Sequence, residues 1–307
     1  MFYNAGAITH AMPPHVTEGA REWKLARRAL ALGARTLVMG VLNVTPDSFS
    51  DGGQFYDHEA ALAHAESMVA EGASIVDVGG ESTRPGSEPV TVGEETRRVV
   101  PLIGRLAKRL DVAISVDTTK SEVARAALDA GAEIVNDISA LRFDFRVADE
   151  AARAGAGLIL MHSRGTPATM QKLPPAADVL REVTHGLRAS VAMAVRRGVR
   201  RERIAIDPGI GFGKTAEQNV ELIAKLRRLA AEFPDLPLVV GTSRKSFVGK
   251  LLDDAPADRR LHGTMASVTA AILHGAHVVR VHDVRAAVET ARVADAVRAV
   301  TGESRDG

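Results

Sequence analysis

The sequence predicts an α/β protein in which eight parallel strands close into a (β/α)8 barrel. Short apolar segments rich in β-branched residues alternate with segments of helical periodicity eight times along the chain. Several helical segments end at a glycine, and no stretch of different composition divides the sequence. Because alternating strands and helices form parallel sheets, and 307 residues suit one barrel, we expect a single barrel domain. An open, doubly wound sheet is the alternative.

The first barrel strand is expected over residues 36–44, a continuous apolar run that is typical of a strand buried on both faces. Pro46 and the pair Gly52-Gly53 then predict a loop. The other strands are expected at residues 74–78, 113–116, 133–135, 158–161, 204–206, 238–240 and 277–281. The helices are expected at residues 57–71, 94–110, 121–130, 145–154, 176–197, 216–232, 265–274 and 286–299.

Residues 1–34 are expected to form an extension that precedes the barrel, which we place at residues 35–301. Within this extension, the pattern of Trp23–Gly33 fits a short basic helix and fits equally a hairpin that caps one end of the barrel. Residues 302–307 are expected to form a polar tail.

The composition is that of an ordinary globular protein, with 46% hydrophobic and 25% charged residues. A formal net charge of +1 argues against nucleic acid as the main partner. The absence of cysteine excludes disulfides, thiolate nucleophiles and cysteine metal sites. No apolar run approaches the length of a membrane span, and the first thirty residues lack the apolar core of a signal peptide, so we expect a cytoplasmic protein.

Polar residues follow nearly every predicted strand, whereas the opposite junctions, from helix to strand, are mostly Gly-Ala pairs. In a barrel the carboxyl ends of the strands meet at one face, where active sites form, so this asymmetry indicates an enzyme. Helix capping is the alternative, and it would explain Ser121 or Thr215 but not eight strand ends. The residues at these strand ends are Asn43, Asp77, Asp117, Asn136, His162, Asp207, Ser243 and His282.

Arg280 and His282 lie two residues apart on the last predicted strand, so both side chains should face the barrel mouth while Val281 faces the helices. A buried arginine needs a counter-charge. An anion is therefore its natural ligand, and a salt bridge with Asp77 or Asp117 is the alternative.

Two further cationic positions occur near strand ends. Arg84 lies in a loop stiffened by Pro85 and Gly86 and could bind an anion. The alternative is an arginine that is only solvated. Lys245 follows another strand, and Ser246 beside it could begin the next helix, where an anion is favoured.

Two nucleotide-binding motifs fail in the segment 207–215. The P-loop spacing requires glycine at position 208, which is Pro208, and the dinucleotide pattern requires glycine where Lys214 stands. The histidines lack zinc-ligand spacing, so we expect His162 to be structural or to support a neighbouring group.

Taken together, seven segments closely resemble the dihydropteroate synthase family. The match runs in order from about residue 36 to residue 284, and the chain departs from the family at none of these motifs. The segments are MGVLNVTPDSFSDGG (39–53), GGESTRPG (79–86), SVDT (115–118), NDI (136–138), DPGIGFG (207–213), GTSRKSF (241–247) and RVHD (280–283).

The resemblance implies a (β/α)8 TIM barrel, usually a homodimer, that acts in folate biosynthesis and is a target of sulfonamides. The implied reaction joins 6-hydroxymethyl-7,8-dihydropterin diphosphate to p-aminobenzoate, giving 7,8-dihydropteroate and diphosphate. It implies small-molecule substrates, no nucleic acid and no membrane.

The family's site residues carry over to matching positions of this chain. The implied catalytic residues are Asp117, Lys245, Asn43 and Arg280. The implied pterin contacts are Asp117, Asn136, Asp207, Lys245, Met161 and Phe212. The implied diphosphate contacts are Asn43, Thr83, Arg84, Arg280 and His282. The implied p-aminobenzoate contacts are Phe49, Thr83, Pro85, Phe212 and Ser246.

Asn43 and the oxygens of a diphosphate would suit Mg²⁺, which takes few protein ligands. The expected mechanism is dissociative: diphosphate leaves first, Asp117 stabilises the pterin cation, and the weakly basic aniline nitrogen attacks without a strong base. A pterin-dependent methyltransferase and a non-catalytic pterin-binding protein are the alternatives. The first would not need the TPDSF and STRPG loops, and the second should lack some of Asn43, Asp117, Lys245 or Arg280.

Overall fold

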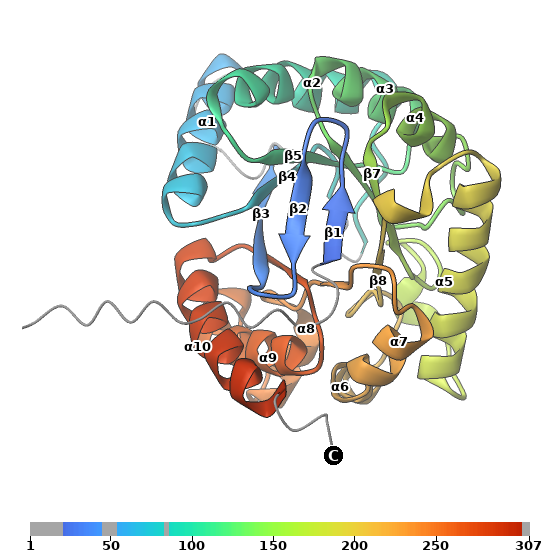
Figure 1. Ribbon diagram of the computed structural model, residues 1–307, viewed down its shortest axis with the longest axis vertical. Coiled ribbons are helices and arrows are strands. Elements are labelled where there is room, and N and C mark those ends of the chain that lie inside the picture. The colour runs from blue at the N-terminus through green and yellow to red at the C-terminus, as the bar shows by residue number, and fades with distance from the viewer. Residues whose placement is uncertain (1–20, 45–53, 83–85, 303–307) are drawn as a thin grey trace, which may run out of the picture.

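The computed structural model describes residues 21–44, 54–82 and 86–302. In this part of the chain, eight parallel strands lie in the order β8-β7-β6-β5-β4-β3-β10-β9, with the helices around them (Figure 1). β8 and β9 meet through a single bridge, Ile206 to Leu238, so the barrel is nearly closed. The predicted (β/α)8 fold is confirmed.

The strands of the described residues are β1 (Arg21–Lys24), β2 (Ala29–Leu32), β3 (Leu37–Asn43), β4 (Ile75–Gly79), β5 (Ala113–Asp117), β6 (Ile134–Asp137), β7 (Gly157–Met161), β8 (Ile204–Asp207), β9 (Val239–Val240) and β10 (Val278–Val281). The helices are α1 (Gln54–Ala70), α2 (Val92–Arg109), α3 (Ser121–Ala130), α4 (Val147–Ala154), α5 (Val179–Arg196), α6 (Ala216–Ala224), α7 (Leu226–Glu232), α8 (Ser246–Leu251), α9 (Leu261–Leu273) and α10 (Val284–Gly302). Within these helices, none is long and apolar enough to cross a membrane.

The structure differs from the expected elements in two helical regions. The helix expected over residues 216–232 is divided into α6 and α7 at Lys225, whose backbone leaves the helical range (φ −102°, ψ 12°). Leu226 and Leu229 are buried beyond this break, so the apolar periodicity continues and hides it. The short helix α8 was not expected, because six residues are too few to establish a period.

Alternation along each strand divides the barrel into two apolar regions. Residues that face outward, such as Val76, Val78, Ile114 and Val116, pack with the helices in the main core. Residues that face inward near the start of each strand, such as Met39, fill the N-terminal half of the barrel. The inward positions in the other half are therefore left for polar side chains.

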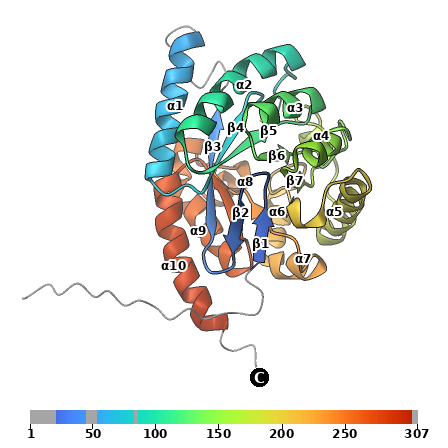
Figure 2. The same cartoon turned by 45° about the horizontal axis from the view of Figure 1, so that its top comes forward.

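β1 and β2 pair as an antiparallel hairpin, so of the two alternatives for Trp23–Gly33 the structure has the hairpin. Its Trp23 is fully buried in one cluster with inward-facing residues of the barrel strands, including Ile75 and Ile159. The Trp23 indole donates a hydrogen bond to the Arg203 carbonyl over 2.9 Å. The hairpin thus covers the N-terminal end of the barrel, as Figures 1 and 2 show from two angles.

Candidate active site

Polar side chains occupy the inward positions at the C-terminal ends of neighbouring strands. Asp77 on β4 lies two residues after the core residue Ile75, and Asp117 on β5 lies four residues after Ala113. The same alternation turns Arg280 on β10 inward, whereas Val281 packs in the outer core. Barrel register therefore brings together groups that lie far apart in sequence.

Arg280 holds two of these carboxylates. Its Nε donates to Asp77 Oδ2 and its Nη2 to Asp117 Oδ2, both over 2.7 Å. Asp77 is fully buried and also accepts a hydrogen bond from the Asn136 amide over 3.1 Å. The salt bridge left open as an alternative for Arg280 is therefore present, with both candidate partners at once.

The pKa of Asp117 lies close to neutral pH. Burial raises the pKa of Asp117 to about 7; Arg280 opposes this shift, and Asp77 and Glu95 add to it. The carboxyl group can therefore gain or lose a proton close to physiological pH, as is common for groups at active sites.

A second cation lies across the barrel mouth. Lys245, at the start of α8, donates a hydrogen bond to the Ile210 carbonyl, and its Nζ lies 4.7 Å from the centre of the Phe212 ring. Burial lowers the pKa of Lys245 to about 8, although Asp207 opposes this shift. Burial likewise raises the pKa of Asp207, and Lys245 opposes it. The two groups thus influence each other within one desolvated region.

The glycine-rich segment 208–215 differs from a phosphate-binding loop in the contacts of its lysine. The Lys214 ammonium donates to three backbone carbonyls, those of His162, Gly209 and Phe212, over 2.8–3.2 Å. Burial lowers the pKa of Lys214 to about 7. Because its donors face two carbonyls of its own loop and that of His162, this lysine does not resemble that of a P-loop. Thr215 caps α6 in a capping box, as the capping alternative allowed.

The other expected cap is absent. α3 has no side-chain cap of its own, and the backbone N–H of Ser121 donates instead to Asp144 Oδ2 over 3.0 Å. The Asp144 carboxylate, from the segment after β6, therefore accepts a hydrogen bond from the N–H at the start of α3, and Ser121 itself is not the capping residue.

His162 is enclosed beside α5, with its ring close to Gly186. Burial lowers the pKa of His162 to about 3, and Lys214 and Arg142 act in the same direction. Across the described ranges, no three His, Cys, Asp or Glu side chains form a group that could hold a metal ion. His162 is thus a neutral, packed side chain.

Of the remaining predicted site residues, four are described by the structure and four are not. Met161 is buried at the end of β7, Asn43 is half-buried at the end of β3, and Ser246 begins α8. The Nδ1 of His282 lies 3.0 Å from Ser243 Oγ. Phe49, Thr83, Arg84 and Pro85 lie outside the described residues.

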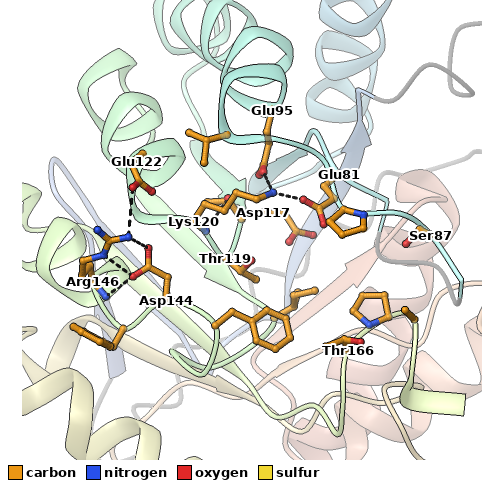
Figure 3. A pocket seen from close by; sticks show the side chains of 18 residues that line it. Glu81, Ser87, Glu95, Asp117, Thr119, Lys120, Glu122, Asp144, Arg146 and Thr166 are labelled. Carbon is orange, nitrogen blue, oxygen red and sulfur yellow. Dashed lines mark hydrogen bonds and ion pairs between the residues drawn. The ribbon is translucent and has the colours of Figure 1, made fainter. Parts of the chain in front are cut away.

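Sequence reasoning missed a charged cluster beside Asp117. Lys120 lies between Glu81 and Glu95, and Figure 3 shows all three with Asp117 on the wall of one cleft. The cleft has a volume of about 840 Å³. Partners 25 and 39 residues apart leave no local sequence signal, so only the fold reveals the cluster.

Carboxylates, an amide and two half-buried cations gathered in the mouth of a barrel define an enzyme site for a small polar ligand. A family model described as "Pterin binding enzyme" matches residues 39–282, which span every strand of the barrel mouth.

Similar proteins identify the family within the pterin-binding enzymes. The chain is 50% identical over 265 residues to the dihydropteroate synthase of Synechocystis sp., covering 86% of this chain and 91% of that protein. It superimposes with a TM-score of 0.82 and 42% identity on dihydropteroate synthase from Clostridium difficile, crystallised in the presence of pteroic acid, over 87% of this chain and 98% of that one. A crystal structure of the Xanthomonas albilineans enzyme with 4-aminobenzoic acid gives a TM-score of 0.84 and 42% identity, over 92% and 99% of the two chains. The chain belongs to the dihydropteroate synthase family.

Proposed function

We propose that this chain is a dihydropteroate synthase that condenses 6-hydroxymethyl-7,8-dihydropterin diphosphate with p-aminobenzoate, forming 7,8-dihydropteroate and diphosphate. The observation that carries the proposal is the Asp77–Arg280–Asp117 arrangement in the barrel mouth, with Lys245 and Asp207 across from it. It places anionic and cationic groups on both sides of one small-ligand site. The similarity to enzymes of this activity over most of the chain supports the same reaction.

The pterin is proposed to lie between Asp207, Asn136 and Lys245. The Asp207 carboxylate suits the amino and N–H edge of the ring, and the Lys245 ammonium suits its carbonyl. Met161, Phe212 and Asp117 complete the proposed pterin contacts. A ligand that hydrogen-bonds to Lys245 would replace the Ile210 carbonyl, which that ammonium contacts in the structure.

The diphosphate is proposed to bind Arg280, Asn43 and His282, together with Thr83 and Arg84. Among the described residues, Asp77 and Asp117 engage two of the five N–H donors of Arg280. Three donors thus stay available to an anion while the carboxylates fix the guanidinium plane. This is the reason that a salt bridge and an anion site are compatible at Arg280.

The donor set at this position fits Mg²⁺. Asn43 offers an amide oxygen at the end of β3, and Mg²⁺ prefers oxygen ligands with few of them from protein. Asn43 would hold the ion together with oxygens of the bound diphosphate. When bound, Mg²⁺ would help to neutralise the charge of the leaving group.

p-Aminobenzoate is proposed to contact Phe212 and Ser246, together with Phe49, Thr83 and Pro85. Phe212 follows the strand that carries Asp207, and Ser246 follows Lys245, so both adjoin the proposed pterin position. An acceptor bound there would present its amine to the pterin methylene carbon.

In the proposed mechanism the bond between the pterin methylene carbon and the diphosphate oxygen breaks first, and the electron pair leaves with the diphosphate. Arg280 stabilises the charge that develops on the leaving group. The Asp117 carboxylate stabilises the pterin cation, whose charge the ring nitrogens share. The aniline nitrogen then forms the new carbon–nitrogen bond and loses its proton to solvent, so no strong base is required.

A homodimer and a cytoplasmic location complete the proposal. Val293, Val297 and Val300 form an exposed apolar stripe on α10, with the spacing i, i+4, i+7 of one helix face. Val293 and Val300 are 68% and 70% exposed, which favours burial against a second copy. Sedimentation of the wild-type chain and of Val293→Glu would test the dimer, and cell fractionation would test the location, which rests on the sequence expectation alone.

A turnover assay tests the function. Purified protein, the pterin diphosphate, Mg²⁺ and p-aminobenzoate should yield diphosphate and a product with the mass of dihydropteroate, dependent on every component. A sulfonamide should compete with p-aminobenzoate. Pterin binding without product would favour a non-catalytic pterin-binding protein, and the absence of both would refute the proposal.

A further inference from the structure

Lys120 connects three elements at the C-terminal face of the barrel. It lies in the segment between β5 and α3, three residues after Asp117. Its ammonium donates to Glu95 Oε2 on α2 over 2.5 Å and to Glu81, which follows β4. Glu95 is 1% exposed, so this ion pair is shielded from water on the side of α2.

The segment that carries Glu81 packs closely against α2. The Gly80 carbonyl accepts a hydrogen bond from Arg98 Nη1 over 2.9 Å. A Cβ atom at Gly80 would lie only 2.7 Å from the Val99 side chain, so glycine is needed for this close approach. Lys120 adds the connection from this packed segment to the segment after β5.

The cluster also affects the charge around Asp117. Glu95 is one of the groups that raise the pKa of Asp117, and Lys120 is the cation paired with Glu95. Glu81, Glu95, Lys120 and Asp117 line the same cleft (Figure 3). The cluster therefore acts on the Asp117 carboxylate through Glu95, whose charge the Lys120 ammonium pairs with.

We propose that Lys120 is a positioning residue for the condensation: held between Glu81 and Glu95, it fixes the segments after β4 and β5 around Asp117 and offsets the charge of Glu95 there. The inference rests on the proposed function. A buried ion pair that only stabilises the fold is the competing explanation.

Two substitutions separate these explanations, because they break the same ion pair with opposite changes in charge. Lys120→Met removes a positive charge and leaves Glu95 without its partner, so the pKa of Asp117 should rise. Glu95→Gln removes a negative charge near Asp117, so that pKa should fall. The other charged groups that face Asp117 are unchanged in both variants: Asp77 from β4, Asp137 from β6, Arg280 from β10 and Lys245 from the start of α8.

The experiment combines kinetics with a titration that does not depend on turnover. The kcat and KM values would be measured against pH for the parent, Lys120→Met, Lys120→Arg and Glu95→Gln. The Asp117 carboxyl carbon would be followed by NMR in each, assigned with Asp117→Asn. We expect Lys120→Met to lower kcat roughly tenfold or more at its optimal pH, since small displacements of reacting groups are costly. Lys120→Arg should restore most of this loss, because the positive charge is retained.

Arg105→Met provides a matched control. Arg105 lies on α2, the helix that carries Glu95. Its Nη2 lies 2.5 Å from Glu59 Oε1 on α1, in a pair outside the barrel mouth. Its kcat and Asp117 titration should equal those of the parent.

A reduced melting temperature with parental kcat and an unshifted Asp117 titration in Lys120→Met would overturn the proposal. If Lys120→Met does not fold, Glu95→Gln and Glu81→Gln decide, and parental kcat and titration in both would overturn it equally. If the parent makes no dihydropteroate, the proposed function fails on its own. The carboxyl titration then still supports or refutes the effect of the cluster on Asp117.

Discussion

The Nη2 atom of Arg280 lies 2.7 Å from Oδ2 of Asp117, so the cation proposed for the leaving group also holds the carboxylate proposed for the pterin cation. Departure of diphosphate and development of positive charge on the pterin would thus occur on two sides of one ion pair. Asp77, fully buried, accepts a hydrogen bond from Nε of the same guanidinium. The arrangement is preorganised before any substrate binds, which is how electrostatic stabilisation acts most strongly.

Asp117→Asn should lower kcat by about 10²-fold, because a neutral amide cannot stabilise the pterin cation. Pterin affinity should fall much less, since the amide keeps the shape of the carboxylate and one acceptor oxygen. Single-turnover rates and calorimetry would measure the two effects. Equal losses in rate and affinity would assign Asp117 to binding alone.

The rate should depend on pH in a bell shape with a narrow maximum. The Asp117 carboxylate forms as the pH rises through about 7, so kcat should increase there. The Lys245 ammonium is lost as the pH rises through about 8, so kcat should decrease above that value. Since the two groups interact, the measured constants belong to the pair.

Removing the Asp117 carboxylate should separate the acid and alkaline limbs of the plot of kcat against pH. In Asp117→Asn the remaining activity should lose its acid limb and keep the alkaline one. An acid limb that persists unchanged in this variant would show that another group controls it.

Much of the barrel could be predicted from the sequence because its signal is local. A strand buried on both faces is a continuous apolar run, and its polar end residue marks the face of the site, as Asp117 and Asp207 illustrate. The inward direction of Arg280 followed from the two-residue period of a strand. The pairing of Arg280 with both carboxylates required the register of the whole barrel.

Other features could not be predicted because no residue type at their positions indicates the backbone conformation. The carboxylate of Asp137 accepts hydrogen bonds from the backbone N–H groups of Ser139 and Leu141, over 2.7 and 2.6 Å. Ala140 and Leu141 have positive φ angles of 50° and 67°, which no residue type there would suggest. A buried aspartate therefore holds an unusual turn beside the site, whereas the sequence shows only a motif residue.

Trp23→Ala should destabilise the protein by about 3–5 kcal/mol, the usual cost of removing a large buried aromatic side chain. Trp23 is fully buried under the N-terminal end of the barrel, so its removal leaves a cavity there. Urea unfolding would measure the loss. Phe143→Ala is the control, because Phe143 is exposed and its removal should change stability by less than about 0.5 kcal/mol. A Trp23→Ala variant as stable as the control would show that the hairpin is dispensable.

Removal of divalent metal with EDTA should abolish turnover, and added Mg²⁺ should restore it. Asn43→Ala should raise the Mg²⁺ concentration that gives half-maximal rate, because the ion would lose its proposed protein ligand. Binding of a pterin without diphosphate should be unaffected by either change. Full turnover in EDTA would refute the requirement for metal.

Arg280→Ala should weaken binding of the pterin diphosphate and should also destabilise the fold. Asp77 would keep its hydrogen bond from Asn136 but lose its cation, and an unpaired buried charge typically costs about 3–5 kcal/mol. Arg280→Lys keeps the charge but cannot engage both carboxylates and an anion in the fixed plane of a guanidinium, so it should restore stability more than affinity. Calorimetry with and without the diphosphate on the pterin, beside urea unfolding, would distinguish the two effects. If diphosphate affinity is unchanged in Arg280→Ala, the three N–H donors that Arg280 shares with no described residue are not the anion site. The role of Arg280 is then confined to holding Asp77 and Asp117.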